Sequence, residues 1–65
     1  MNKADRRTID AIVNGEEEKI TCGNYVIRVN GEHVHVASAV NMFEKSFSNR
    51  ISAAVWMARV IKASA

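Results

Sequence analysis

The apolar residues near the start of the chain repeat at helical spacing. Ile9, Ile12 and Val13 lie three and four residues apart, which places them on one side of a helix. Asn2 followed by Asp5 is a weak form of the capping box that opens helices. Gly15 stands where a left-handed residue commonly closes a helix. We therefore predict a first helix that begins after Asn2 and ends at Asn14 and Gly15.

The middle of the chain has the alternating pattern of a β-hairpin. YVIRV and EHVHV are separated by Asn30 and Gly31, a dipeptide typical of two-residue type I′ turns. This Asn30-Gly31 hairpin would place Val29 opposite Glu32. Side chains on one strand face alternate, so the predicted apolar face consists of Tyr25, Ile27, Val29, Val34 and Val36. The predicted polar face consists of Arg28, His33 and His35, together with Val26.

A further strand can precede this hairpin. Ile20 and Cys22 occupy even positions, whereas the apolar face of the hairpin starts at Tyr25. Either a tight turn at Gly23 and Asn24 makes a three-stranded meander, with Cys22 opposite Tyr25, or a glycine bulge changes the phase of one long strand. The meander is the preferred interpretation, which gives a sheet of two or three strands.

The remainder of the chain, residues 38–64, reads as helical. It contains no Pro or Gly and is rich in Ala, Met, Ile and Val, so we predict one long helix or two, with Ser48 and Asn49 available to cap a second one. The seam expected to cover the sheet consists of Val40, Phe43, Phe47, Ile51, Ala54, Ala58 and Ile61. Met42, Ala53, Met57 and Val60 widen it to an arc of about 180°, more than one sheet needs. The additional contact would be either the first helix or a partner chain.

Together these elements predict a single small α+β domain over residues 1–65. An N-terminal helix precedes an antiparallel sheet, and a long or broken C-terminal helix packs on that sheet. A 65-residue core is marginal, and the single cysteine cannot form an intramolecular disulfide, so we expect homo-oligomerisation, for example a homodimer. No apolar run approaches the roughly 18–20 residues that span a bilayer. We therefore expect a cytoplasmic protein with no membrane partner.

Residues with the potential for chemistry are few. His33 and His35 project from the same strand face and could approach Cys22, but their spacing does not match structural zinc sites. The chain has no glycine-rich phosphate loop and no nucleophile elbow. We therefore predict a protein that is not an enzyme, with no catalytic residues, no cofactor and no metal.

Two functions remain compatible with these features. The first is a small regulatory or inhibitory protein that docks on another protein, because Trp and Arg are the residue types most often found at interface hot spots. The predicted contact residues are Trp56, Arg59, Lys45, Met42 and Val60. Trp56 falls on the polar arc of the predicted helix, and its alternative role is to pack against the first helix within the monomer.

The second function is a DNA- or RNA-binding regulator. Its predicted contact residues are Arg28, His33 and His35 on the sheet and Lys3, Arg6 and Arg7 on the first helix. Nine Lys and Arg residues against seven Asp and Glu residues give a net charge of only +2. The polar sheet face also carries no aromatic side chain on which a base could stack. These features favour protein docking as the first hypothesis.

Overall fold

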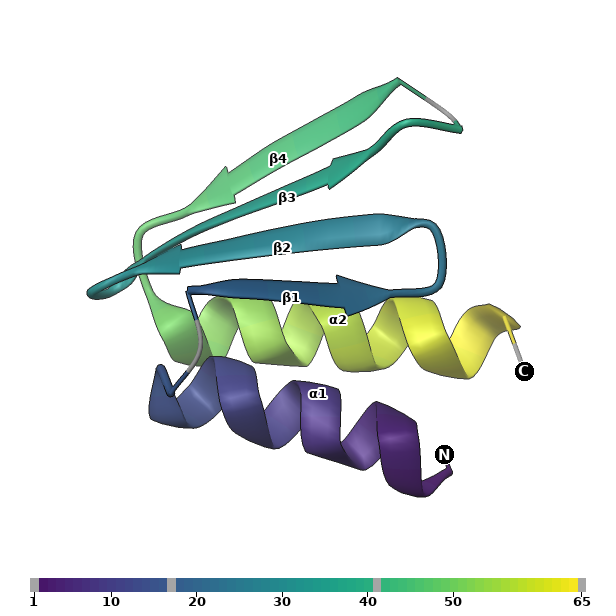
Figure 1. Cartoon of the computed structure of the whole chain (residues 1–65), viewed down its shortest axis with the longest axis horizontal. Coiled ribbons are helices and arrows are strands. Elements are labelled where there is room, and N and C mark those ends of the chain that lie inside the picture. Colours follow the sequence, from purple (N-terminus) through teal and green to yellow (C-terminus); the bar gives the residue numbers. More distant parts are fainter. Residues whose placement is uncertain (1, 17, 41, 65) are drawn as a thin grey trace.

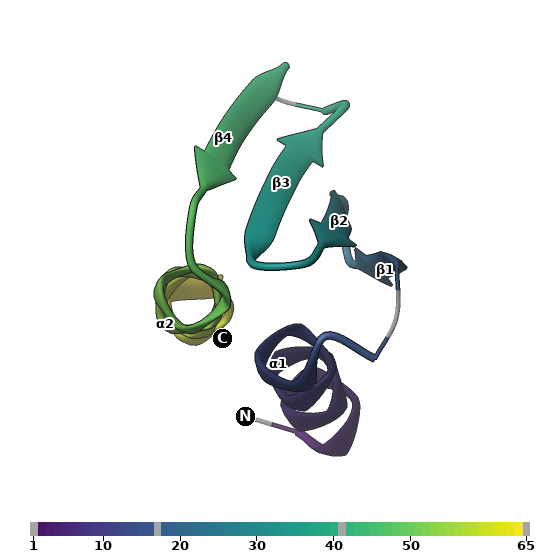
Figure 2. The ribbon, with the colours of Figure 1, turned by 90° about the vertical axis from the view of Figure 1, so that its left-hand side faces the viewer.

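The computed structural model describes residues 2–16, 18–40 and 42–64 and confirms the α+β architecture. The elements in chain order are α1 (Lys3–Asn14), β1 (Lys19–Cys22), β2 (Tyr25–Asn30), β3 (His33–Ser38), β4 (Phe43–Phe47) and α2 (Arg50–Ser64). The strands form an antiparallel sheet in the order β1-β2-β3-β4 (Figure 1). Figure 2 shows both helices on the same side of this sheet. The sheet thus has four strands rather than the two or three that were predicted.

The first helix has the predicted ends. The Asn2 side chain accepts a hydrogen bond of 2.8 Å from the backbone N–H of Asp5, so it caps the first turn. At the other end, Gly15 adopts φ 66° and donates its N–H to the Ala11 carbonyl at 2.9 Å. This left-handed C-cap leads the chain directly towards the sheet.

The predicted meander is confirmed, but the hairpin turn lies one residue later than predicted. Cys22 is opposite Tyr25, as expected. In the next hairpin Val29 pairs with Val34 rather than Glu32, because the two turn residues are Gly31 and Glu32. Among the described residues of this turn only Gly31 has a positive φ, 63°, which is the first-position glycine of a type II′ turn rather than the two positive φ values of type I′. The partner of each residue shifts by two positions, so every side chain keeps its predicted face.

The predicted helical segment over residues 38–64 is wrong before Arg50, because Ser38 ends β3 and residues 43–47 form β4. Phe43 lies opposite Ser38, and Phe47 lies opposite Val34. A spacing of four residues places two side chains on one face of a strand as well as on one side of a helix, so the two phenylalanines did not discriminate between the two structures. The chain reverses without glycine because Met42 itself adopts φ 49°. Within the described part of residues 38–64, α2 is the only helix, and it corresponds to the second of the two helices that were considered.

The core lies between the sheet and the two helices. The buried apolar residues are Ala11, Ile12, Ile20, Ile27, Val29, Val34, Val36, Ala53, Ala54 and Met57. The predicted seam is therefore wrong at Ile51, which is 53% exposed, and at Val40, which is 68% exposed and lies before β4. α1 packs alongside α2 and supplies the additional contact that α2 required. In the described part of the chain, no helix is both long and apolar enough to cross a bilayer.

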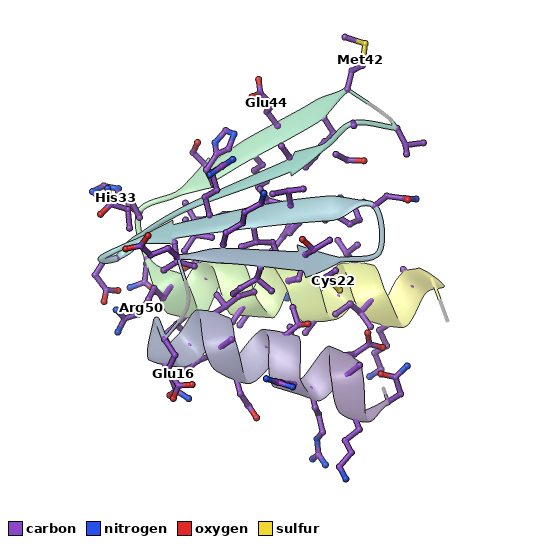
Figure 3. The ribbon with its side chains drawn as sticks, in the orientation of Figure 1. Glu16, Cys22, His33, Met42, Glu44 and Arg50 are labelled. Carbon is purple, nitrogen blue, oxygen red and sulfur yellow. The ribbon has the colours of Figure 1, made fainter. Side chains whose placement is uncertain are left out.

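Arg50 links three elements at one end of the molecule (Figure 3). Its Nη1 donates to the Gly31 carbonyl at 3.3 Å, and its Nη2 lies 3.3 Å from a carboxylate oxygen of Glu32. The same guanidinium packs against Gly15 at the end of α1. Asn49 completes the start of α2, because its side-chain oxygen accepts from the N–H of Ser52 at 3.1 Å. The end of α1, the β2–β3 turn and the start of α2 are thereby held together.

Candidate functional site

An aromatic cluster fills the space between α2 and strand β4. The Trp56 ring is stacked on Phe43, with centroids 5.5 Å apart and planes at 1°, and it contacts Phe47 at 5.7 Å. Tyr25 meets Trp56 edge to face at 6.1 Å. All four rings are partly buried rather than enclosed. The cluster therefore packs against the helix-facing side of β4 and still presents aromatic surface to solvent.

Positive charge flanks this aromatic cluster. Lys45 lies on the same face of β4 as the phenylalanines, and its Nζ is 5.5 Å from the centre of the Phe47 ring. Arg59 is exposed on α2, three residues after Trp56. Glu44 projects from the opposite face of β4, where its carboxylate lies 3.3 Å from Nε2 of His35. Glu44, the acidic neighbour of Lys45 in the strand, therefore does not neutralise this lysine.

Met42 is an exposed apolar residue at the start of this edge. Its side chain projects away from the body of the molecule at the β3–β4 turn (Figure 3). It is 90% exposed, and its φ of 49° is a conformation in which glycine or asparagine is much more common. We call Met42, Phe43, Lys45, Phe47 and Trp56 the β4 surface. It combines an edge strand, a partly open aromatic floor and one cation, Lys45.

Of the predicted docking residues, Trp56, Lys45 and Met42 lie on the β4 surface, but they come from two elements rather than from one helix. Lys45 and Met42 are not on a helix with Trp56, and Trp56 packs against the sheet rather than on a solvated arc or against α1. Val60 is partly buried and lines a separate cavity of about 310 Å³, together with Tyr25. The sequence interpretation treated Phe43 and Phe47 as helical core and missed their part in the surface. FEKSF gave no local signal for this role, because two phenylalanines four residues apart fit a helix as well as a strand.

The residues predicted for nucleic-acid binding lie elsewhere. Arg28, His33 and His35 are on the face of the sheet away from the helices, as predicted. Lys3, Arg6 and Arg7 are exposed on α1, where they line a groove against β1. His35 also contacts the Ser46 hydroxyl at 3.0 Å through Nδ1.

Cys22 points to the helix side of the sheet and is therefore separated from both histidines. Among the described residues, no three His, Cys, Asp or Glu side chains are grouped so that they could hold a metal ion. The geometry thus offers two surfaces, the β4 edge and the cationic side of α1 and β1. Comparison with protein families, with curated proteins and with solved structures finds no match to this chain.

Proposed function

We propose that this chain is a small non-enzymatic regulatory or inhibitory protein that acts by docking on another protein. The β4 surface is the contact, and the partner contributes an extended segment that carries both acidic and apolar residues. Docking of this kind regulates a partner by occupying part of its surface. The observation that carries the proposal is the open aromatic floor directly beside an edge strand.

The edge strand supports an extended partner segment. β4 pairs with β3 on one side and is the last strand of the described sheet. Backbone N–H and C=O groups on its other side can bond to an added strand, a recurrent mode of peptide recognition. Alternate side chains of that strand would lie over Phe43, Phe47 and Trp56. Apolar residues at these positions would extend the aromatic cluster.

The charge of the β4 surface supports an acidic partner rather than a second copy of this chain. Lys45 lies beside the aromatic floor, whereas Glu44, the acidic residue of β4, faces the other side of the sheet. An antiparallel pair of β4 strands centred on Lys45 would place this lysine opposite itself, and like charges in directly opposed positions are destabilising. An acidic residue in the same place would form a favourable pair.

Met42 supports recognition because its conformation is costly. A non-glycine residue in the left-handed region loses about 1 kcal/mol relative to glycine. Its side chain recovers little of this by packing, since it is 90% exposed. An apolar contact with a partner would give this side chain a stabilising role. Met42→Gly should accordingly keep the fold and lose affinity, a combination that separates binding from stability.

The test is selection of binding peptides from a displayed random library, followed by affinity measurement with synthetic peptides. We expect enrichment of segments that alternate apolar and acidic residues. Lys45→Glu and Met42→Gly should each weaken binding of such a peptide by about tenfold, the equivalent of about 1.4 kcal/mol. Lys19→Glu, with the same charge change at the opposite edge of the sheet, should bind like the unmodified chain.

Two outcomes would contradict the proposal. One is enrichment of basic peptides, or of none, by a folded protein. The other is equal loss of affinity in Lys45→Glu and Lys19→Glu, which would show that only net charge matters. Amide exchange provides an independent measurement, because an added strand should protect the β4 amides that do not bond to β3.

A further inference from the structure

A groove with excess positive charge runs between α1 and strand β1, on the other side of the molecule from the β4 surface. Its volume is about 1020 Å³. Four cations line it, namely Lys3, Arg6, Arg7 and Lys19. Asp10 and Glu16 are the acidic residues in its lining, so the charge of the groove is positive by two. We call this feature the basic groove.

The cations of the basic groove are available to a ligand. All four are exposed, and within residues 2–16, 18–40 and 42–64 none of them forms an ion pair. Arg50 differs from them, because Glu32 and the Gly31 carbonyl already hold its guanidinium. Four unpaired cations along one groove attract anions more strongly than the small net charge of the whole chain indicates.

The positive charge continues from the groove onto the open face of the sheet. Lys19 is directly opposite Arg28 in the neighbouring strand. These two cations form one row across β1 and β2. Neither helix covers that face (Figure 2). The groove and this row together form a cationic band that wraps around the β1 edge.

The spacing and the walls of the groove fit a phosphodiester backbone. Lys3 and Arg7 are one helical turn apart on the same side of α1, about 6 Å along its axis, so their flexible side chains can reach neighbouring phosphates of one strand. The exposed wall residues are small or polar, such as Ala4 and Thr21. Single-stranded nucleic acid is usually held on aromatic side chains, and the groove lining contains none. A partner protein that docks through large apolar side chains would also find no large exposed apolar residue in the groove lining.

We infer that the basic groove binds the phosphate backbone of a double-stranded nucleic acid, without reading its sequence. Lys3, Arg7 and Lys19 contact phosphates, and Arg28 extends the contact across the sheet. This binding uses residues other than those of the β4 surface. Duplex binding and protein docking can therefore be tested independently of each other.

Fluorescence anisotropy with a labelled 20-base-pair duplex tests this inference. Three to four phosphate contacts predict that affinity falls about 40- to 150-fold between about 50 and 200 mM salt. Lys19→Glu and Arg7→Glu should each weaken binding about tenfold at the lower salt and reduce the salt dependence by about one contact. Lys45→Glu is the matched control, since it changes the charge equally at an exposed site on the opposite edge. It should stay within about twofold of the unmodified chain.

Three results would overturn the inference. The first is the absence of duplex binding at the lower salt concentration by protein whose circular dichroism shows it to be folded. The second is an equal loss in Lys45→Glu and Lys19→Glu, which would reduce the effect to net charge. The third is tighter binding of polyglutamate or of a single-stranded oligonucleotide of the same length, which would assign the groove to acidic protein segments or to unpaired strands.

Discussion

The contact between Gly15 and Arg50 makes a specific prediction about stability. Gly15 has φ 66°, and a Cβ at this position would lie 2.9 Å from Nη1 of Arg50 and 3.2 Å from its Cζ. Gly15→Ala therefore imposes two separate costs. Alanine must adopt a left-handed conformation, and the guanidinium must leave its place between α1 and the β2–β3 turn.

The two costs can be estimated separately. The left-handed conformation costs alanine about 1–2 kcal/mol. The Arg50 side chain is flexible and can move, so the second cost is limited to the interactions that it loses. Its ion pair with Glu32 is partly exposed, with side-chain exposures of 29% and 55%, and contributes about 0.5 kcal/mol after solvent screening. The hydrogen bond to the Gly31 carbonyl contributes about 1 kcal/mol. We expect Gly15→Ala to lower the free energy of unfolding by about 3 kcal/mol.

This loss is a large part of the stability of a domain of this size, for which roughly 3–10 kcal/mol is typical. Urea unfolding, followed by the fluorescence of the single tryptophan Trp56, measures it. The control is a double-mutant cycle with Arg50→Ala. In the Arg50→Ala background, Gly15→Ala should cost only the conformational part, about 1–2 kcal/mol. Equal costs in both backgrounds would refute the argument, because they would show that the guanidinium is not constrained at Gly15.

Two further predictions concern the sheet and α2. Ser38 is 2% exposed and its hydroxyl has no hydrogen-bond partner among the described residues, so Ser38→Ala should raise the free energy of unfolding by about 1 kcal/mol. A lower melting temperature in circular dichroism would contradict this. Asn49→Ala removes the side-chain acceptor of the Ser52 N–H and should cost about 1 kcal/mol. Asn49→Ser should retain most of the stability, whereas equal losses in the two variants would argue against a capping role.

The elements that could be predicted from the sequence depend on local signals. α1 has a capping side chain at Asn2 and a glycine at its end, and both act within a few residues. The faces of β2 and β3 follow from simple alternation, and they stay correct even though the turn moved from Asn30-Gly31 to Gly31-Glu32. A shift of a two-residue turn changes each partner by two positions, which preserves the face. The register itself depends on which turn conformation the chain adopts.

β4 could not be predicted because its formation depends on tertiary contacts. Residues 39–42 contain neither glycine nor proline, and Asn41 is the one residue there of a type common in turns, so the local turn signal is weak. FEKSF becomes a strand by pairing with β3, and Phe43 and Phe47 then pack on Trp56. Context of this kind overrides weak intrinsic preferences in short segments. The same error gave a wrong environment for Trp56, because a helix continuous through residues 43–47 would place this side chain on the polar arc rather than against Phe43 and Phe47.

The candidate docking residues were predicted from their residue types and from the wide apolar arc of a helix that is wrong over β4. Trp, Arg and Met are common at interfaces in any fold. Trp56, Arg59 and Met42 were therefore predicted as contacts even though Met42 does not lie on the helix that carries Trp56 and Arg59. In the structure these residues come from two elements, β4 with the turn before it and α2, rather than from one face of a single helix. Lys19 was not proposed for the basic groove, because only the packing of β1 beside α1 places it near the cations of the helix.

The two edges of the sheet differ in a way that explains how the β4 surface can stay open. Strand β1 has only four residues, and very short edge strands resist pairing with other chains. β4 is protected differently, because Lys45 lies on its helix-facing side, and an inward-directed lysine opposes edge-to-edge association of identical strands. The same lysine would favour an acidic side chain in an incoming strand. In the docking mode that we propose, this single residue would disfavour pairing of two β4 strands and favour an acidic partner.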